Sequence, residues 1–197
     1  MAVLRLKLVV FFFLCSSLYS VAQSNYPVLL PKPQQVKWYA ETTACSGVEI
    51  SKAENQEYIH HCLSDLGIVA QELASTKLEI TMVDQIEEAR VNQHEAYRLR
   101  INDHYIHIEA ITEQGVYWAF QTLRQLMVHD KDQLVVQNCE IIDWPAFRIR
   151  GFMHDVGRGF IPVDELKKQI ALLSQFKINV FHWHLTEDIG WRLESKV

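Results

Sequence analysis

The chain has no concentration of positive charge and no apolar stretch of membrane-spanning length. Its 197 residues carry a formal net charge of −5, and no segment is rich in lysine and arginine. Nucleic acids and anionic membrane surfaces bind clustered basic residues, so neither is an expected partner. The apolar run over residues 8–14 is much shorter than the about 20 residues that cross a bilayer, so no integral membrane span is predicted.

Cysteine frameworks, internal repeats and low-complexity segments are also missing. The chain has 4 cysteines, of which Cys45, Cys62 and Cys139 follow the N-terminal segment. These form at most one disulfide among themselves, and their spacing matches neither a disulfide framework nor a zinc motif. Buried, reduced cysteines are therefore favoured, and one disulfide is the alternative. The composition, 49% apolar and 22% charged, is that of a globular protein that buries a core.

The N-terminal segment, residues 1–22, is predicted to be a signal peptide. Arg5 and Lys7 precede the apolar run, and the small residues of Ser20-Val21-Ala22 suit the positions that a signal peptidase reads. Cleavage there would make Gln23 the new N-terminus. The expected location of the mature protein is therefore outside the cell or in a periplasm.

Residues 24–144 are predicted to form a small α/β domain. Apolar and polar residues alternate in a hairpin that turns at Asn102-Asp103, and apolar residues recur at helical spacing after Thr112, the expected N-cap of a helix. Gly115, at the start of that helix, allows a close approach to a strand. The other expected elements are strands at residues 47–51, 78–83 and 135–142 and a helix at residues 55–66.

Residues 145–197 are predicted to begin a (β/α)8 barrel. A strand at residues 150–156, a helix with Asp164 as its N-cap, and a second strand at residues 179–185 follow one another directly. A strand, a crossover helix and a parallel strand form the unit from which such barrels are built. The expected fold class is therefore α/β: a small α+β N-terminal domain followed by the first βαβ portion of a (β/α)8 TIM barrel.

This barrel is expected to be truncated. A complete (β/α)8 barrel takes roughly 250 residues, whereas only residues 145–197 are available for it here. We therefore expect the chain to be a fragment of a longer protein. Catalytic groups of such barrels lie on the loops that follow the strands, and Arg158, Glu187 and Asp188 occupy those loops.

The two expected barrel strands carry two motifs. The first is Arg150-Gly151-Phe152 followed by Asp155 and Arg158, and the second runs from Lys177 through Asn179-Val180-Phe181-His182-Trp183-His184-Leu185-Thr186-Glu187-Asp188 to Gly190-Trp191-Arg192. In this order, with a helix between them, they resemble the opening of the catalytic barrel of glycoside hydrolase family 20, the β-N-acetylhexosaminidases. The middle of the chain resembles the small α/β domain that precedes the barrel in that family.

Three positions depart from the common pattern of the family. Gly159 follows the loop arginine where a bulky residue is usual, and His154 stands where leucine is frequent. The acidic pair after the second strand is Glu187-Asp188, whereas Asp-Asp is common. The first two departures affect the shape of the expected sugar pocket, and the third affects the mechanism.

The resemblance implies an exo-acting enzyme that releases terminal β-linked N-acetylhexosamine with retention. In the family the 2-acetamido oxygen of the substrate attacks the anomeric carbon, and an adjacent Asp-Glu pair orients the acetamido group and supplies general acid and base catalysis. That pair follows the fourth barrel strand, so we expect it beyond Val197 and expect the 197-residue chain to be inactive. No cofactor and no metal are implied, and the expected partners are glycans or glycoconjugates with terminal N-acetylhexosamine.

The resemblance also implies roles for particular residues. Arg158 matches an arginine that holds the 3- and 4-hydroxyls of the terminal sugar, a task that suits the planar fork of a guanidinium. Glu187 matches a carboxylate that hydrogen-bonds a histidine of a later strand and supports the general acid through it, and Asp188 is the alternative residue for that role. Trp191 packs beside a sugar face or has a structural role at the rim. The alternative for Arg158 is an exposed loop arginine or an ion-pair partner of Asp155.

Two other functions stay open on the sequence alone. His182 and His184 are two residues apart on a strand and share one face, as two zinc ligands of a metal-dependent barrel hydrolase would. Such hydrolases usually place this pair on the first barrel strand, whereas here it lies on the second. A non-catalytic carbohydrate-binding protein is the other alternative, although an unclosed barrel is a poor binding module.

Overall fold

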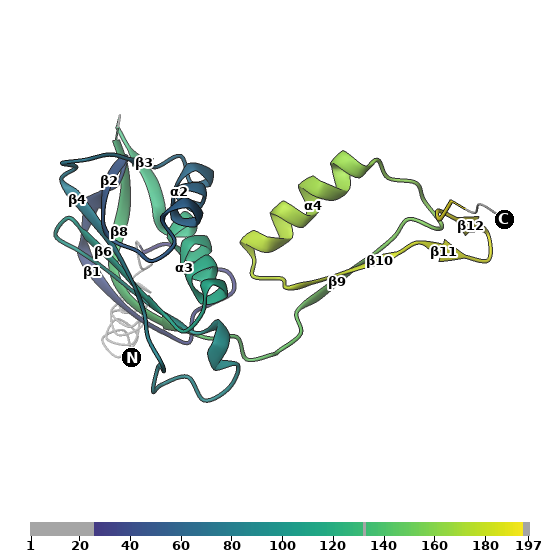
Figure 1. Cartoon of the computed structure of the whole chain (residues 1–197), viewed down its shortest axis with the longest axis horizontal. Coiled ribbons are helices and arrows are strands. Elements are labelled where there is room, and N and C mark those ends of the chain that lie inside the picture. Colours follow the sequence, from purple (N-terminus) through teal and green to yellow (C-terminus); the bar gives the residue numbers. More distant parts are fainter. Residues whose placement is uncertain (1–25, 132, 195–197) are drawn as a thin grey trace, which may run out of the picture.

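The structure is a computed structural model that describes residues 26–131 and 133–194. The predicted signal peptide lies outside these residues. The chain folds into a sheet covered by helices, followed by a strand-helix-strand unit beside it (Figure 1). Within the described ranges, no helix has the length and apolar character needed to span a membrane.

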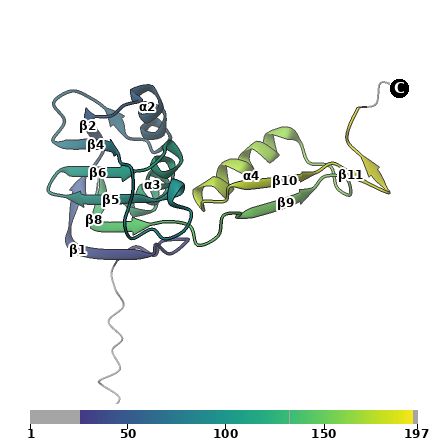
Figure 2. The same ribbon diagram turned by 60° about the horizontal axis from the view of Figure 1, so that its bottom comes forward.

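In the described part of the chain, eight strands form one mixed sheet. They are β1 (Gln35–Ala44), β2 (Gly47–Lys52), β3 (Val69–Ala70), β4 (Thr76–Met82), β5 (Tyr97–Asn102), β6 (Tyr105–Ala110), β7 (Met127–Asp130) and β8 (Gln133–Asp143). The strand order is β1-β8-β5-β6-β4-β2-β3, with β7 paired to β8. Figure 2 shows this order from β1 to β2. The strands β2, β3, β4 and β6 pair in parallel, and the other pairs are antiparallel.

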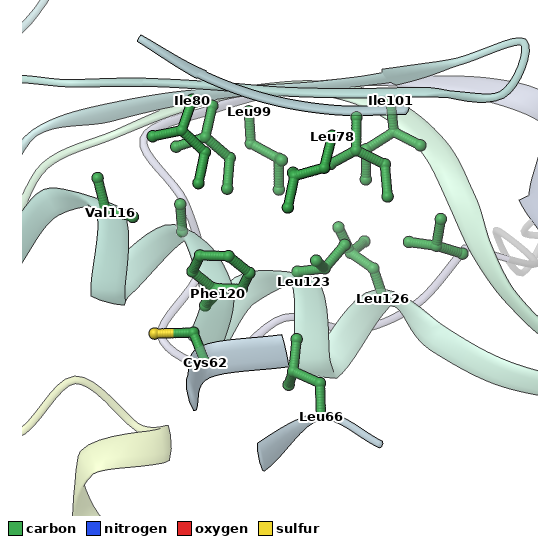
Figure 3. Packing of buried hydrophobic residues seen from close by; sticks show 14 of the residues in the cluster. Cys62, Leu66, Leu78, Ile80, Leu99, Ile101, Val116, Phe120, Leu123 and Leu126 are labelled. Atoms are coloured by element: carbon green, nitrogen blue, oxygen red, sulfur yellow. The ribbon is translucent and has the colours of Figure 1, made fainter. Parts of the chain in front are cut away.

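Two helices, α2 (Gln56–Asp65) and α3 (Glu113–Leu126), cover one face of this sheet (Figure 1). Alternate residues of a strand point to one face, and residues three or four apart share one side of a helix, so both elements present apolar stripes to each other. Figure 3 shows the resulting core between the strands and the helices. Its labelled members are Leu78, Ile80, Leu99 and Ile101 of the strands, Val116, Phe120, Leu123 and Leu126 of α3, and Cys62 and Leu66 from the α2 segment.

Local signals predicted for this sheet-and-helix unit, called the small domain below, are confirmed with one correction. The Thr112 side chain accepts a hydrogen bond from the Gly115 amide at 3.4 Å and caps α3. A Cβ atom at Gly115 would lie 2.6 Å from the carbonyl oxygen of Ala96, so the expected close approach is present. The predicted turn at Asn102-Asp103 is wrong by one residue, because Asp103 and His104 are the two residues with positive φ, 30° and 68°, that a tight hairpin turn needs.

The second unit consists of β9 (Gly151–Asp155), α4 (Val163–Gln175) and β10 (Val180–His184). The strands are parallel neighbours, in register from Gly151 opposite Val180 to Asp155 opposite His184, as predicted. The prediction of Asp164 as N-cap is wrong. Pro162 holds that position with an extended backbone and no side-chain cap, and Asp164 lies in the first turn, where its charge favours the helix dipole.

The α/β fold class is therefore confirmed. Five strands were not predicted: β1, β3, β7, and the short hairpin strands β11 (Thr186–Glu187) and β12 (Gly190–Trp191). The last strand of the small domain ends at Asp143 and the next sheet begins at Gly151. The domain limits of 24–144 and 145–197 stay predictions.

Candidate functional site

The loops that follow β9 and β10 lie at the same edge of the parallel pair, because parallel strands end on the same side. They are joined by backbone contacts. The Val156 amide donates to the His184 carbonyl at 3.0 Å, and the Val156 carbonyl accepts a hydrogen bond from Nε of Arg192 at 2.8 Å. The two loops therefore form one polar surface at this edge.

Two glycines let these loops approach closely. A Cβ atom at Gly157 would lie 3.2 Å from the Glu187 side chain and 3.2 Å from Asp155 Oδ1. A Cβ atom at Gly190 would collide with the Gly157 carbonyl oxygen. The absence of side chains at these two positions brings Glu187 next to the end of β9.

Asp155 holds Arg158 in place at the start of the first loop. Its Oδ1 atom accepts the Arg158 backbone amide at 3.1 Å, and its Oδ2 atom accepts Nε of the guanidinium at 2.5 Å. Hydrogen bonds from Arg158 lower the pKa of Asp155 below its ordinary value of 3.8, and the Asp155 carboxylate, with a smaller contribution from Glu187, raises the pKa of Arg158. Both groups are therefore charged at neutral pH.

The outer edge of the Arg158 guanidinium stays available. Among the described residues, no hydrogen bond of the protein engages its two terminal nitrogens, and the side chain is 63% exposed. An arginine that is fixed through Nε and the backbone is oriented, and its remaining donors form a planar fork. This arrangement suits two neighbouring hydroxyls or a carboxylate of a ligand.

His184 lies between the Asp155 and Glu187 carboxylates. Its Nδ1 atom is 3.8 Å from Asp155 Oδ2, and its Nε2 atom is 3.6 Å from Glu187 Oε1. The order along this edge is therefore guanidinium, carboxylate, imidazole, carboxylate. Asp155 thus lies beside a guanidinium and an imidazole, and Glu187 lies beside the imidazole, so neighbouring groups can offset the negative charge of both carboxylates.

The other predicted site residues are exposed. Asp188 lies in the turn between β11 and β12, and the side chain of Trp191 on β12 is 64% exposed. The structure brings Arg158 and Glu187 together through Asp155 and His184, and it places Asp188 beside this group rather than in it. The functional roles of Arg158, Glu187, Asp188 and Trp191 stay predictions.

Asp155, His184 and Glu187 are also the one group in the described ranges with spacing suited to a metal ion. Their ligand atoms lie within 4.8 Å of one another. His182 is not in this group, so the sequence-based pairing of His182 with His184 does not supply the set. Asp155 already bonds the Arg158 guanidinium, and a metal ion at this place would have to compete with that cation.

Sequence reasoning treated Asp155 only as an alternative ion-pair partner and did not give His184 a place beside Glu187. The spacing of Asp155 and Arg158, three residues apart across a strand end, was the available signal for the first. His184 and Glu187 are also three residues apart, so their spacing was an available signal too. The place of His184 beside Asp155 depends on the register of β9 and β10, which puts the two residues opposite each other. No local sequence pattern contains that register.

Two family models match this chain. "Glycosyl hydrolase family 20, domain 2" matches residues 26–144, and "Glycosyl hydrolase family 20, catalytic domain" matches residues 147–197. The first match covers the small domain and more than half of the chain. The second covers β9, α4, β10 and the loops with the candidate site.

Relatives with similar sequences are beta-hexosaminidases. The chain is 42% identical over 109 residues to the beta-hexosaminidase of Porphyromonas gingivalis and 44% identical over 101 residues to that of Vibrio furnissii. These stretches are 52% and 51% of this chain but 14% and 16% of the two relatives. The chain thus spans a small part of the length of the proteins that it matches.

Solved structures agree in architecture. The family 20 exo beta-N-acetylglucosaminidase of Vibrio harveyi in complex with N-acetylglucosamine superimposes with a TM-score of 0.68 and 30% identity, over 85% of this chain and 27% of that one. The beta-N-acetylhexosaminidase of Bacteroides fragilis gives a TM-score of 0.71 and 26% identity, over 86% and 35%. On the family matches, the sequence similarity and the shared architecture, the chain belongs to glycoside hydrolase family 20.

Proposed function

We propose that the protein containing this chain is an exo-acting glycoside hydrolase that releases terminal β-linked N-acetylhexosamine with retention. The names of its relatives support the activity, and the N-acetylglucosamine in the Vibrio harveyi structure supports the sugar class. Glycans or glycoconjugates with this terminal sugar are the proposed substrates. The predicted signal peptide favours secretion or a periplasmic location as part of the proposal.

The observation that carries the proposal is the presentation of Arg158. Its guanidinium is fixed to Asp155 through Nε and leaves its terminal nitrogens exposed at the carboxyl end of the parallel strands. In α/β barrels this end holds the substrate. A rigid fork of two donors matches two adjacent equatorial hydroxyls of a sugar ring, so Arg158 is assigned to the hydroxyls on the side of the sugar opposite the scissile bond.

The proposed mechanism is substrate-assisted. The acetamido carbonyl oxygen attacks the anomeric carbon while a general acid protonates the leaving glycosidic oxygen, and water then opens the cyclic intermediate from the face that the leaving group occupied. The two displacements give net retention. The resemblance puts the carboxylate pair for these steps on the fourth barrel strand, and Glu187 would support the general acid through a histidine of a later strand.

Replacement of Arg158 in the full-length enzyme tests this proposal. We expect Arg158→Ala to lower kcat/KM on an aryl N-acetylglucosaminide by roughly 10²-fold, because hydrogen bonds to a charged group contribute about 1.5 to 3 kcal/mol each. Arg158→Lys should recover only part of the loss, since an ammonium group lacks the fork. The exposed Arg148, replaced in the same way, is the control and should leave kcat/KM unchanged.

An unchanged kcat/KM in a folded Arg158→Ala enzyme would make the arginine a structural loop residue. Inversion at the anomeric carbon, followed by NMR of the first-formed sugar, would contradict the substrate-assisted mechanism. Activity of the 197-residue chain alone would contradict the placement of the carboxylate pair on a later strand.

A further inference from the structure

Three buried charged side chains and a fourth that is partly buried lie where the small domain meets the second unit. Glu95, Asp143 and Lys177 are 1%, 6% and 6% exposed, and the Arg150 side chain is 14% exposed. They form two ion pairs: Lys177 with Asp143 at 2.7 Å, and Arg150 with Glu95. These four residues are called the anchor cluster below. None of them belongs to the candidate site at the strand ends.

Lys177 donates two hydrogen bonds inside this cluster. Its Nζ atom donates to Asp143 Oδ2 at 2.7 Å and to the Tyr97 hydroxyl oxygen at 2.8 Å. Tyr97 in turn donates to Asp143 Oδ2 at 3.1 Å and shares a 2.6 Å hydrogen bond with Thr122. Burial, followed by the Asp143 charge, raises the pKa of Tyr97 well above 10, so the phenol keeps the proton that this network needs.

Arg150 connects the two ion pairs. Its guanidinium bonds the Glu95 carboxylate, donates from Nε to the Lys177 carbonyl at 2.7 Å, and lies 5.6 Å from the centroid of the Trp118 ring. The Trp118 indole N–H donates to Glu95 Oε2 at 2.7 Å. Both buried carboxylates are therefore neutralised by a cation and a neutral donor, as buried charges require.

The chain positions of these residues are informative. Arg150 directly precedes β9, and Lys177 lies three residues before β10, whereas Glu95 and Asp143 belong to the small domain. Each ion pair thus joins the N-terminal end of one parallel strand to the small domain. Figure 1 shows the opposite ends of β9 and β10, which lead toward β11 and β12, on the side away from the sheet.

The backbone at Lys177 adds an independent observation. The helices α2 and α4 end with the same pair of backbone hydrogen bonds. In α2 the amides of Gly67 and Ile68 donate to the carbonyls of Ser64 and Leu63. In α4 the amides of Lys177 and Ile178 donate to the carbonyls of Ser174 and Leu173. Such an ending needs a left-handed residue, and glycine is the usual choice. Gly67 has φ 72° and Lys177 has φ 60°. A lysine therefore stands at a position where glycine is the less strained residue, and its side chain forms the ion pair with Asp143.

Apolar packing at this junction is incomplete. A cavity of about 240 Å³ lies at the junction, and the four residues of the anchor cluster line it together with Trp118, Trp144 and Phe147. Among residues 26–131 and 133–194, the other hydrogen bonds between the units are Tyr117 to Ser174 at 2.9 Å and Gln125 to the Gln175 carbonyl at 3.3 Å, both near the end of α4. The buried ion pairs are therefore the principal specific contacts that fix the strand ends.

We propose that the small domain functions as an anchor for the first two parallel strands, and that it holds their N-terminal ends through Lys177 on Asp143 and Arg150 on Glu95. The anchor fixes the spacing of β9 and β10 and thereby the loops that carry Arg158 and Glu187. This function does not depend on the substrate proposed above, because it is measured without activity.

Hydrogen exchange of the 197-residue chain tests the anchor. We expect Lys177→Met to raise the exchange rates of the β9 and β10 amides by about tenfold or more, while the amides of β5 and β6 keep theirs, because removal of one partner leaves Asp143 buried without its cation. Lys168→Met is the matched control: Lys168 lies on α4, pairs with Glu165 at 2.7 Å and is 72% exposed. Its replacement should change no region. Unchanged exchange of β9 and β10 in Lys177→Met overturns the proposal.

Two further variants keep the test decisive if Lys177→Met folds poorly. Lys177→Gly removes the ammonium group and also relieves the strain of the left-handed backbone. Faster exchange of the β10 amides in this variant supports the proposal. Slower or unchanged exchange would show that the ammonium group is dispensable and overturn the proposal. The double variant Lys177→Met with Asp143→Asn removes both charges. Lys177→Met and Asp143→Asn are also measured alone, and each gives a factor by which the exchange rates of the β9 and β10 amides rise. The rise in the double variant should be smaller than the product of these two factors. A rise equal to the product would show that the residues act separately and overturn the proposal.

Discussion

At the residue scale, Asp155 determines how Arg158 is presented. A free arginine side chain loses about 2 kcal/mol of rotamer entropy when it is fixed. The hydrogen bond from Nε to Asp155 orients the side chain before a ligand binds, and the bond from the Arg158 amide to Asp155 holds the backbone beside it. The side chain is largely exposed, so the ion pair contributes little to global stability. In the proposed enzyme, the contribution of this ion pair is to orient the remaining donors of Arg158 toward the sugar.

This pair predicts a measurable titration. The pKa of Asp155 is lowered by Arg158, so the contribution of the pair to stability is present above the unfolded value of 3.8 and is lost as the pH falls through the lowered folded-state pKa. NMR titration of the Asp155 carboxyl in the 197-residue chain should give a pKa below 3.8. Arg158→Ala should raise that pKa toward 3.8, and Arg148→Ala should not. An identical Asp155 pKa with and without the Arg158 side chain would contradict the ion pair.

Glu187 and Asp188 make different predictions in the full-length enzyme. Glu187 is beside His184 and close to Arg158, whereas Asp188 is exposed in the turn. If Glu187 supports the general acid, Glu187→Gln lowers kcat and shifts the alkaline limb of the pH-rate profile with KM nearly unchanged. Asp188→Asn is the neighbouring control. A larger loss of kcat in Asp188→Asn, with Glu187→Gln near wild type, would transfer the role to Asp188.

Some functional residues can be predicted from the sequence, and others cannot. Arg158 and Glu187 are found because they follow strands that the apolar pattern makes visible. Lys177 lies four residues after Leu173, in line with the apolar side of α4, and its partner Asp143 is 34 residues away. A lysine at a buried stripe position was the one local sign of the anchor cluster. The partner could not be predicted, because it depends on how two units pack.

At the scale of elements, the contact between the two loops depends on glycine. Gly190→Ala would push a methyl group into the Gly157 carbonyl and separate the loops, so we expect kcat/KM of the full-length enzyme to fall by about tenfold or more. At Gly159 a Cβ atom would meet nothing within 4 Å, so Gly159→Ala is the matched control and should retain activity. Equal effects of the two substitutions would show that loop contact does not set the activity.

Elements with a regular local pattern were predictable, and irregular ones were not. The helices α2 and α3 and the β5–β6 hairpin have capping residues and apolar spacings that agree with their structure. The register of β1 against β8 shifts between Trp38 and Thr42, which breaks the alternation by which a strand is recognised. The strands of the β11–β12 hairpin have two residues each, too few for any period.

At the scale of the whole molecule, the three described cysteines are buried and free. Burial raises the pKa of Cys45 to about 11 and that of Cys139 to about 12, and it also raises the pKa of Cys62. A chain that begins at Gln23 should therefore react slowly with a thiol reagent when folded and show three thiols in denaturant. An introduced thiol at the exposed Val28 should react at once. One thiol in denaturant would reveal a disulfide instead.

The second unit exposes apolar residues on a parallel strand pair, which is unusual because parallel sheets are normally covered on both faces. Phe152, Met153 and Trp183 are 40%, 52% and 47% exposed. Addition of an apolar dye to the 197-residue chain should therefore give strong fluorescence, and Met153→Lys should weaken it while the small domain stays folded. Dye binding that persists undiminished in this variant would locate the exposed surface elsewhere.

The anchor cluster and the polar loops occupy opposite ends of the same two strands. The residues that join the two units are therefore different from the residues of the polar loops, and a substitution in one set does not remove a contact of the other. An evolving lineage can exchange the loop from Val156 to Pro162, including the unusual Gly159, while Arg150 and Lys177 keep the strands in place. If the proposed function holds, new glycan preferences are open to this scaffold without a compensating change at the junction.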